Sequence, residues 1–485
     1  MAIISESDRA IGVLIALFLG VLCFVAAQAL ANTQNTTGLA IMLGILIAII
    51  CFNWPESGLY ILILSMLLGP EIIVGNLGGG TYAGRGVTLR VDDFLLTIIA
   101  FSWFARGAVH KELGLLLSTP LNRPIGIYLL AAAVSTAIGI LSDRVRPLVG
   151  FFFVLKFVEY IFVYFAAVNF IQDKVHLKRL IYAVFITGIL VSLYASMQIP
   201  RGVRVSAPFE GEIGEPNTLG GYLLFLLALF GGLLVSSPKL RQAWRYAAGI
   251  IILGIPFLFT LSRASYFGLA AVAVCLLIFS RQKIIAVFSV TILALTLVLV
   301  APPRVGERIQ YTFGGQREYV GQITVGGVRL DTSTSARIQA YRDILMDFPE
   351  HPLLGYGVTG YGFVDAQFAK VLIEMGLLGL AAFIWLILSL YRQGWAAFKT
   401  AADRWEQGLC IGYIAGLTGL IFHALGSNTF IIVRIMEPFW LLVGTMTHLH
   451  IFNTQAAEME AEPDTEPDSI HKRASTGLLY PSGGG

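Results

Sequence analysis

Apolar stretches about as long as a membrane-crossing helix recur along almost the whole chain. A helix needs roughly 20 predominantly apolar residues to cross the hydrocarbon core of a bilayer. The stretches lack the apolar–polar alternation of barrel strands, so we expect helices. Fourteen stretches qualify: 11–31, 38–53, 57–73, 92–105, 122–140, 150–171, 178–198, 218–236, 246–262, 264–280, 284–301, 369–390, 408–425 and 431–451. The sequence therefore predicts an all-α, polytopic membrane protein with about 14 (12–14) transmembrane helices and one large extracytoplasmic loop.

The composition supports this class. Of the 485 residues, 56% are hydrophobic and 13% are charged, against about 25% charged residues in an ordinary soluble domain. The four cysteines all fall inside predicted spans and lack metal-binding spacing. Buried, unreactive thiols are therefore the better interpretation of these cysteines.

The distribution of lysine between the spans predicts the orientation of the chain. With the N-terminus in the cytoplasm, all seven lysines outside the spans fall on the cytoplasmic side. An even number of spans then returns the C-terminus to the cytoplasm, and residues 302–368 become the largest extracytoplasmic loop.

The basic residues assigned to the outer segments are all arginines. The planar fork of arginine binds phosphate oxygens in pairs, which would suit a phosphate site outside the membrane. The alternative is that lysine simply marks the cytoplasmic side. The loop at 302–368 has seven acidic residues and six arginines, so it does not attract polyanions in general, and we expect no nucleic-acid partner. A phosphate site would have to be a local cluster.

The segment 337–380 combines a polar stretch, a Gly-rich turn and the start of an apolar helix. In a chain that is otherwise mostly membrane helix, a polar stretch of this size has to lie outside the bilayer. It adds little to the packing of the spans, which makes it the first candidate for chemistry or recognition.

Two pairs of opposite charges lie within predicted spans. Lys156 and Glu159 have a spacing that allows a mutual salt bridge, and the alternative is that they line a cavity for a lipid substrate. Lys370 and Glu374 share one helix face with Gln367. Their spacing allows an internal ion pair, and the alternative is that this polar face borders a water-filled cavity.

Four motifs occur in one order over roughly residues 200–450. They are SAPFEGEIGEPNTLGGYL at 206–223, TLSRASYFGLA at 260–270, HPLLGYGVTGYG at 351–362 and LIEMGLLGL at 372–380. In order, spacing and topology these motifs resemble the O-antigen ligase/polymerase family, which comprises membrane glycosyltransferases of the GT-C type that act on polyprenyl-diphosphate-linked glycans. The N-terminal third matches only in its pattern of spans.

The resemblance implies a division of the chain into three parts. Residues 1–200 would be N-terminal transmembrane helices, and residues 201–451 a catalytic membrane region that includes the loop at 302–368. Residues 452–485 are acidic and would form a disordered cytoplasmic tail.

The resemblance also implies the reaction and its place. An acceptor hydroxyl would attack the anomeric carbon of a polyprenyl-diphosphate-linked donor at the outer face of a bacterial inner membrane, with inversion and with no metal or cofactor. The departing diphosphate needs positive charge, and the acceptor hydroxyl needs a group that orients or deprotonates it. The outer loops have no DxD pair and no His/carboxylate cluster with metal-ligand spacing. The bilayer is an expected partner, and a chain-length regulator or an export protein is a further candidate.

Arginines near two of the motifs are candidates for the diphosphate site. The family carries an arginine at the place of Arg263, in a tight hairpin between two spans. The alternative is an interfacial arginine that extends to lipid headgroups. Arg201 and Arg204 precede the EPN element that contains Asn217. Of these two, we expect Arg204 to join Arg263 on the diphosphate.

Two further arginines fall in outer segments. Arg337 would share a helix face with Tyr341 as a sugar-phosphate contact, and a solvated amphipathic helix is the alternative. Arg434 has the spacing to pair with Glu437, and its guanidinium could also reach the diphosphate.

The chain departs from the family at Asp365. Ligases of the family carry a histidine followed by asparagine nine residues before the glutamate of an E-x-G-x-x-G helix, and counting back from Glu374 gives Asp365-Ala366. Asp365 could replace the histidine as base or orienting carboxylate, as in the DxQ variants of exopolysaccharide polymerases. The alternative is an N-cap of the following helix. His351, before Pro352 in the Gly-rich turn, is either a second candidate base or a turn residue.

Three functions follow from these observations. The first is a polymerase that joins lipid-linked oligosaccharides into O-antigen or exopolysaccharide. The second is a ligase that transfers the glycan to lipid A or another acceptor, and the missing histidine weakens it. The third is a transporter or flippase. Polar residues gather toward one face rather than along a midplane path, which favours a one-sided catalyst.

Overall fold

The computed structural model describes residues 36–69, 71–74, 87–110, 118–208, 214–280, 324–325, 328–329, 332–362 and 364–461. The chain forms two compact units, of which the first is Met1–Leu62 with Asp92–Leu115 and the second is Ile63–Val91 with Leu116–Gly485. The first unit contains α2 (Thr36–Asn53), part of α3 (Pro55–Leu68) and nearly all of α4 (Val91–His110).

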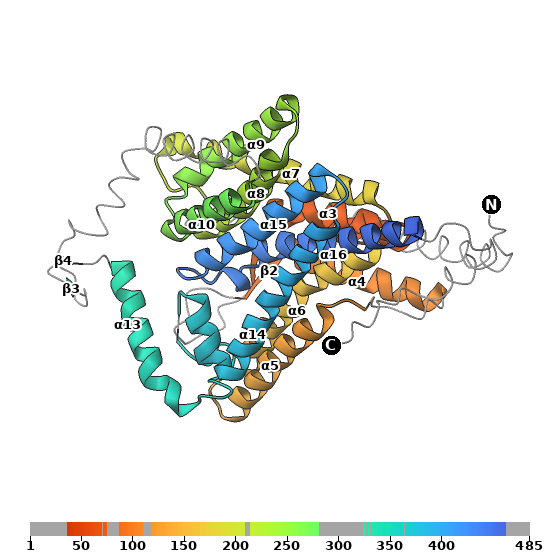
Figure 1. Ribbon diagram of the computed structural model, residues 1–485. Helices are drawn as coiled ribbons and strands as arrows, with labels where there is room; N and C mark the ends of the chain where they lie inside the picture. The colour runs from red at the N-terminus through yellow and green to blue at the C-terminus, as the bar shows by residue number, and fades with distance from the viewer. Residues whose placement is uncertain are drawn as a thin grey trace. The chain divides into compact units, whose positions relative to one another are not determined.

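The second unit contains the remaining elements (Figure 1). They are β1 (Glu71–Val74), β2 (Val87–Arg90), α5 (Asn122–Leu141), α6 (Pro147–Phe170), α7 (Lys174–Ser196), η1 (Ile199–Arg201), α8 (Pro216–Ser236), α9 (Leu240–Phe259), α10 (Arg263–Phe279), β3 (Thr324–Val325), β4 (Val328–Arg329), α13 (Thr332–Asp347), η2 (Phe348–Glu350), α14 (Gln367–Thr400), α15 (Arg404–His423), η3 (Thr429–Ile431) and α16 (Val433–Ala461). The strands form two short antiparallel hairpins, β1–β2 and β3–β4. The all-α prediction is therefore confirmed for the described part of the chain.

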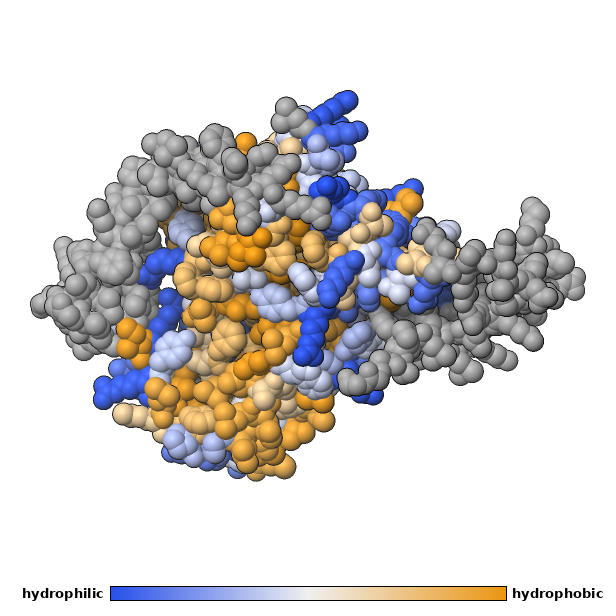
Figure 2. Space-filling model, in the orientation of Figure 1, coloured by the Kyte–Doolittle hydropathy of each residue, from blue (hydrophilic) through white to orange (hydrophobic). Residues whose placement is uncertain are grey.

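Among the described residues, six helices are long and apolar enough to cross a membrane. They are Asn122–Leu141, Pro147–Phe170, Lys174–Arg201, Pro216–Ser236, Arg241–Phe259 and Gln367–Thr400. Large apolar side chains such as Ile127 and Leu388 remain exposed on these helices, and Figure 2 shows an apolar surface over α5 and α14. Lipid is as apolar as such side chains, so exposure of this kind is typical of a membrane protein. The chain is a polytopic membrane protein.

The number of spans stays a prediction. The predicted spans at 11–31 and 284–301 lie outside the described residues. The prediction of 57–73 was too long, because α3 ends at Leu68 and Glu71–Val74 is a strand. At the other end of the chain, α16 continues to Ala461, ten residues into the segment predicted as a tail.

Helix α8 lies at the centre of the second unit. Its sequence is apolar on all sides. Of its apolar membrane-spanning segment 89% is buried inside the protein, whereas for α9 the corresponding share is 28%. Glycines let neighbouring backbones approach it closely. A Cβ atom added at Gly232 would lie 2.3 Å from the carbonyl oxygen of Gly408 on α15, so only glycine fits at this contact.

Polar contacts join α7, α15 and α16 at one end of the second unit. Lys174 Nζ lies 3.2 Å from Glu406 Oε1, and Lys178 Nζ lies 3.3 Å from Asp403 Oδ2. Glu406 is buried, and it also accepts a hydrogen bond from Asn453 at 2.8 Å. These contacts bring the N-terminal turns of α7 and α15 together at the end that the sequence assigns to the cytoplasm.

Helix α14 breaks at Gly376, which has a φ of 66° and a ψ of −167°. A break frees backbone groups that must find other partners in a low-dielectric environment. The Gly-rich turn supplies them in four hydrogen bonds: Tyr356 N to Ile373 O (3.0 Å), Gly357 N to Glu374 O (2.8 Å), Leu377 N to Pro352 O (2.8 Å) and Leu378 N to Leu353 O (3.2 Å). The backbone of the HPLLGYG motif therefore hydrogen-bonds the groups that the break in α14 leaves without helical partners.

A Gly376→Ala substitution should destabilise the protein. A Cβ atom at this position would lie 2.3 Å from the carbonyl group of Leu353, and a backbone conformation of this kind costs a non-glycine residue about 1–3 kcal/mol. We expect a lower midpoint of thermal unfolding for the purified protein. Gly254→Ala on α9 is the matched control, because a Cβ there meets no atom within 4 Å. Equal midpoints for the two variants would show that the break tolerates a side chain.

Candidate functional site

The N-terminal turns of α8 and α10 lie side by side. A Cβ atom added at Gly220 of α8 would lie 2.2 Å from Ser265 Oγ of α10, so the two first turns touch. Helix α8 begins with Pro216 and Asn217, while Ser262 caps α10 by accepting a hydrogen bond from Ser265 N at 3.3 Å. Each helix N-terminus presents backbone N–H groups and a partial positive charge, an arrangement that favours anions.

Arg204 and Arg263 both adjoin the turn before α10. Arg204 Nε donates to the carbonyl oxygen of Thr260 at 2.9 Å, and Arg263 is the first residue of α10. Leu261, in the same turn, has a φ of 50°, in the left-handed region that a branched side chain rarely adopts. Strain of this kind is concentrated at functional sites, where surrounding contacts maintain it. The structure thus brings the EPN element, Arg204 and Arg263 together.

A loop between α15 and α16 connects these N-termini to the start of α14. His423 Nδ1 lies 2.7 Å from Thr429 Oγ1, and the His423 ring packs against Gly221 of α8. On the other side, Asn428 Nδ2 donates to Val364 O at 2.6 Å, and Gln367 N donates to the carbonyl oxygen of Ala424 at 3.0 Å.

Arg337 and Asp365 form an ion pair beside this loop. Arg337 Nη2 lies 2.7 Å from Asp365 Oδ2 and also donates to Gly426 O at 2.9 Å. A Cβ at Gly426 would lie 3.4 Å from the Cβ of Ala264, the residue after Arg263. Gly426 is therefore bound by Arg337 and adjoins the residue after Arg263, while Asp365 pairs with Arg337 and Arg204 binds the turn before Arg263. We call Gly426, Arg204, Arg263, Arg337 and Asp365 the Gly426 site.

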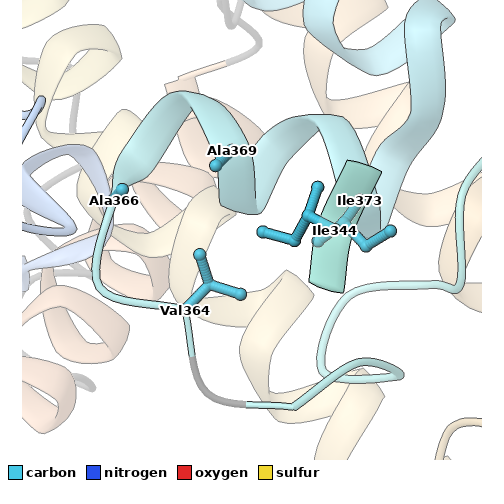
Figure 3. Close-up of a cluster of buried hydrophobic side chains, with 5 residues drawn as sticks. All are labelled: Ile344, Val364, Ala366, Ala369 and Ile373. Atoms are coloured by element: carbon cyan, nitrogen blue, oxygen red, sulfur yellow. The ribbon is translucent and has the colours of Figure 1, made fainter. Parts of the chain in front are cut away.

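Apolar packing holds Asp365 in this position. Ile344 of α13 packs against Val364, Ala366, Ala369 and Ile373, and all five side chains are buried (Figure 3). The N-cap of α14 is Ala366, with no capping side chain. The alternative that Asp365 caps the following helix is therefore wrong.

Three other candidate residues do not belong to the Gly426 site, although one of them stabilises a segment beside it. Arg434 is buried and donates to the carbonyl oxygen of Pro208 at 2.7 Å, which fixes the segment after Arg204 to α16. Arg201 is exposed at the end of η1. Tyr341 follows Arg337 by one turn of α13, and the partial burial of its exposed ring raises its pKa, so its hydroxyl stays protonated near neutral pH.

His351 lies in the Gly-rich turn and not beside Asp365. Its ring makes an edge contact with Tyr356, with centroids 4.7 Å apart. The neighbouring Pro352 binds Leu377 N, whereas Asp365 precedes the first turn of α14. About ten helical residues, or about 15 Å along α14, separate Leu377 from the first turn of the helix. Burial and the hydrogen bond to Glu350 raise the pKa of Tyr356 to about 12, so this tyrosine also remains protonated near neutral pH.

Both predicted intrahelical ion pairs are confirmed. Lys156 Nζ lies 2.9 Å from Glu159 Oε2, and Lys370 Nζ lies 2.5 Å from Glu374 Oε1. Glu374 is buried and also accepts a hydrogen bond from Thr359 N at 3.0 Å, so this pair supports the Gly-rich turn. Within the described residues, no three His, Cys, Asp or Glu side chains gather as metal ligands, and the absence of a metal stays a prediction.

Sequence reasoning missed the loop that carries Gly426, Asn428 and Thr429. The run Gly-Ser-Asn-Thr between two apolar stretches marks a turn. The signal for the turn was present, but nothing in the sequence links that turn to Arg337, which lies 89 residues earlier in the chain.

Comparison with known proteins gives one finding. The model of the O-Antigen ligase family matches residues 248–384, and no curated protein matches the chain. The matched region begins in α9 and ends in α14, so it contains Arg263, Arg337 and Asp365. Members of this family are membrane glycosyltransferases. Residues 248–384 are therefore an O-antigen ligase family domain within a polytopic membrane protein.

Proposed function

We propose that the chain is an inverting, metal-independent glycosyltransferase that polymerises polyprenyl-diphosphate-linked oligosaccharides at the outer face of a bacterial inner membrane. The observation that carries this proposal is the Gly426 site. There, arginines and two helix N-termini lie next to a half-buried carboxylate, within or beside the domain of the O-antigen ligase family.

The donor half of the site is the α8–α10 side. As the bond from the anomeric carbon to the diphosphate breaks, negative charge grows on the departing phosphate oxygen. Arg263, supported by Arg204, would bind the phosphate oxygens in pairs. The N–H groups in the first turns of α8, with Asn217, and of α10 would add further donors. Groups fixed before the reaction stabilise such charge most effectively.

The acceptor half is the Asp365 side. Its carboxylate is 29% exposed, enough for an acceptor hydroxyl to reach it. The hydroxyl oxygen attacks the anomeric carbon as the bond to the diphosphate breaks, and its proton passes to Asp365. Attack opposite the leaving group gives inversion. Arg337 orients the carboxylate through the 2.7 Å ion pair, and Tyr341 would contact the sugar phosphate.

The acceptor decides between a polymerase and a ligase. Asp365 in place of the ligase histidine favours a second lipid-linked glycan as acceptor, and the name of the matched family favours lipid A or a similar acceptor. Deletion of the gene should leave short lipid-linked repeats in the cell if the protein is a polymerase. Accumulation of long, unattached polymer would contradict this and assign a ligase, and an unchanged glycan profile would contradict both.

The orientation of the chain is part of the same proposal. The Gly426 site would face away from the cytoplasm, because it lies at the end of the second unit opposite the Lys174–Glu406 ion pair, which the lysine distribution assigns to the cytoplasm. A cysteine in place of Gly362 should then react with an impermeant thiol reagent on intact cells with a permeabilised outer membrane. Labelling only after lysis of the inner membrane would place the site in the cytoplasm.

A further inference from the structure

Helix α13 carries an apolar face that no described part of the second unit covers. Ile338, Tyr341, Arg342, Leu345 and Met346 are all exposed, Leu345 at 71% and Met346 at 64%. At about 100° per residue they occupy an arc of about 140° on the helix. We call these five residues the outer face of α13. An apolar arc of this width is normally buried against a partner.

The rest of α13 already has its contacts. Ile344 packs into the cluster at the start of α14 (Figure 3), and Arg337 binds Asp365. Gln339 and Asp343 lie beyond the outer face and bond to each other at 2.8 Å, and both are exposed. The helix therefore has one side on the protein, one polar side, and the apolar outer face.

The break in α14 indicates how far α13 lies from the bilayer. The 24 residues from Leu377 to Thr400 form a helix about 36 Å long, enough to cross a hydrocarbon core of about 30 Å without the turns before Gly376. The outer boundary of the hydrocarbon should then lie near Gly376. Leu377 and Leu378, just past the break, are 48% and 53% exposed, as expected for side chains that face lipid.

The Gly-rich turn joins α13 to this boundary. Leu377 N donates to Pro352 O at 2.8 Å, and Leu353 next to it is 60% exposed. Helix α13 ends at Asp347, only a few residues before the turn. The C-terminal half of the outer face therefore lies close to the depth where the apolar surface of the span begins.

The single charge on the outer face suits a lipid surface. Arg342 lies among Ile338, Leu345 and Met346, so its methylene stem would lie on apolar surface while its guanidinium reaches phosphate. Tyrosine is typical of the headgroup level, where the ring is partly in lipid and the hydroxyl in water. A helix with these features lies in the interface of a bilayer.

We propose that the outer face of α13 docks on the outer leaflet of the bilayer, with Leu345 and Met346 among the acyl chains and Arg342 among the headgroup phosphates. This anchoring does not depend on the proposed reaction. It would hold Arg337, which lies one turn before Tyr341 beside the edge of the outer face, close to the level at which the phosphates of any lipid-linked substrate lie.

The test places a nitroxide spin label at single positions of the full chain in a cysteine-free background. The protein is reconstituted in vesicles of phosphatidylethanolamine and phosphatidylglycerol, and collisions with oxygen and with a water-soluble nickel chelate are measured. Labels at Ile338 and Leu345 should collide severalfold more with oxygen than with nickel. Labels at Gln339 and Asp343, the matched controls on the polar side, should show the reverse.

Two outcomes would overturn the proposal. If nickel reaches Ile338 and Leu345 as readily as Gln339 and Asp343, the outer face is in water. If neither oxygen nor nickel reaches Ile338 and Leu345, protein covers the face. Retained glycan transfer by the labelled proteins would show that they are folded. The accessibilities to oxygen and nickel test the docking of α13 whether or not the proposed reaction is correct.

Discussion

Arg263→Lys is expected to lose most of the transfer activity while the protein still folds and inserts. Lysine keeps the charge but lacks the planar fork that binds two phosphate oxygens at once. Removal of one preorganised donor to developing charge costs about 10²–10³ in rate. Because Arg263 begins α10 at the contact with α8, a lysine there would also aim its ammonium group less precisely. Initial rates with a polyprenyl-diphosphate-linked oligosaccharide would measure the loss.

Arg241→Lys is the matched control for this experiment. Arg241 is exposed at the opposite end of α9, far along the chain from the α9–α10 turn, so its replacement should leave the rate unchanged. Arg204→Lys is less diagnostic, because Arg204 also holds the carbonyl of Thr260 and its loss could disturb the turn. Full activity in Arg263→Lys would return Arg263 to the alternative of an arginine that extends to lipid headgroups.

The apolar helices and the motifs of the proposed donor side could be recognised in the sequence because their signals are local. A run of apolar residues is sufficient to identify a membrane helix, and Arg263 and Asn217 lie within short motifs of the sequence. That the two motifs meet follows from Gly220 against Ser265, a contact that no single motif contains. The motifs could be named from the sequence, and tertiary packing supplied their arrangement.

The Asp365 side could be predicted only in part because its contacts are long-range. Asp365 stood out by alignment with a family histidine, but its ion pair with Arg337 spans 28 residues of the chain. The break at Gly376 shows the same limit, since a glycine within an apolar helix does not by itself indicate a break. Its backbone conformation depends on partners in the Gly-rich turn, which also explains why His351 lies there rather than beside Asp365.

Asp365→Asn is expected to reduce the turnover number by about 10²–10⁴, the usual contribution of a positioned base. Asparagine keeps the size of the side chain and can still accept a hydrogen bond from Arg337, but it cannot take the proton of the acceptor hydroxyl. The capping alternative no longer applies, because Ala366 is the N-cap of α14. The midpoint of thermal unfolding and the KM for the donor should therefore change little.

The pairing with Arg337 makes a second interpretation testable in the same experiment. If Asp365 acts only by holding Arg337 against the donor, Asp365→Asn and Arg337→Gln should both raise the KM for the donor, with similar turnover numbers to the parent protein. If Asp365 is the base, its substitution lowers the turnover number and leaves that KM near its original value. Asp343→Asn, an exposed carboxylate on α13, is the control for loss of a nearby negative charge. An Asp365→Asn protein with full turnover would remove Asp365 as the base, and the search for the base would move to His351 in the Gly-rich turn.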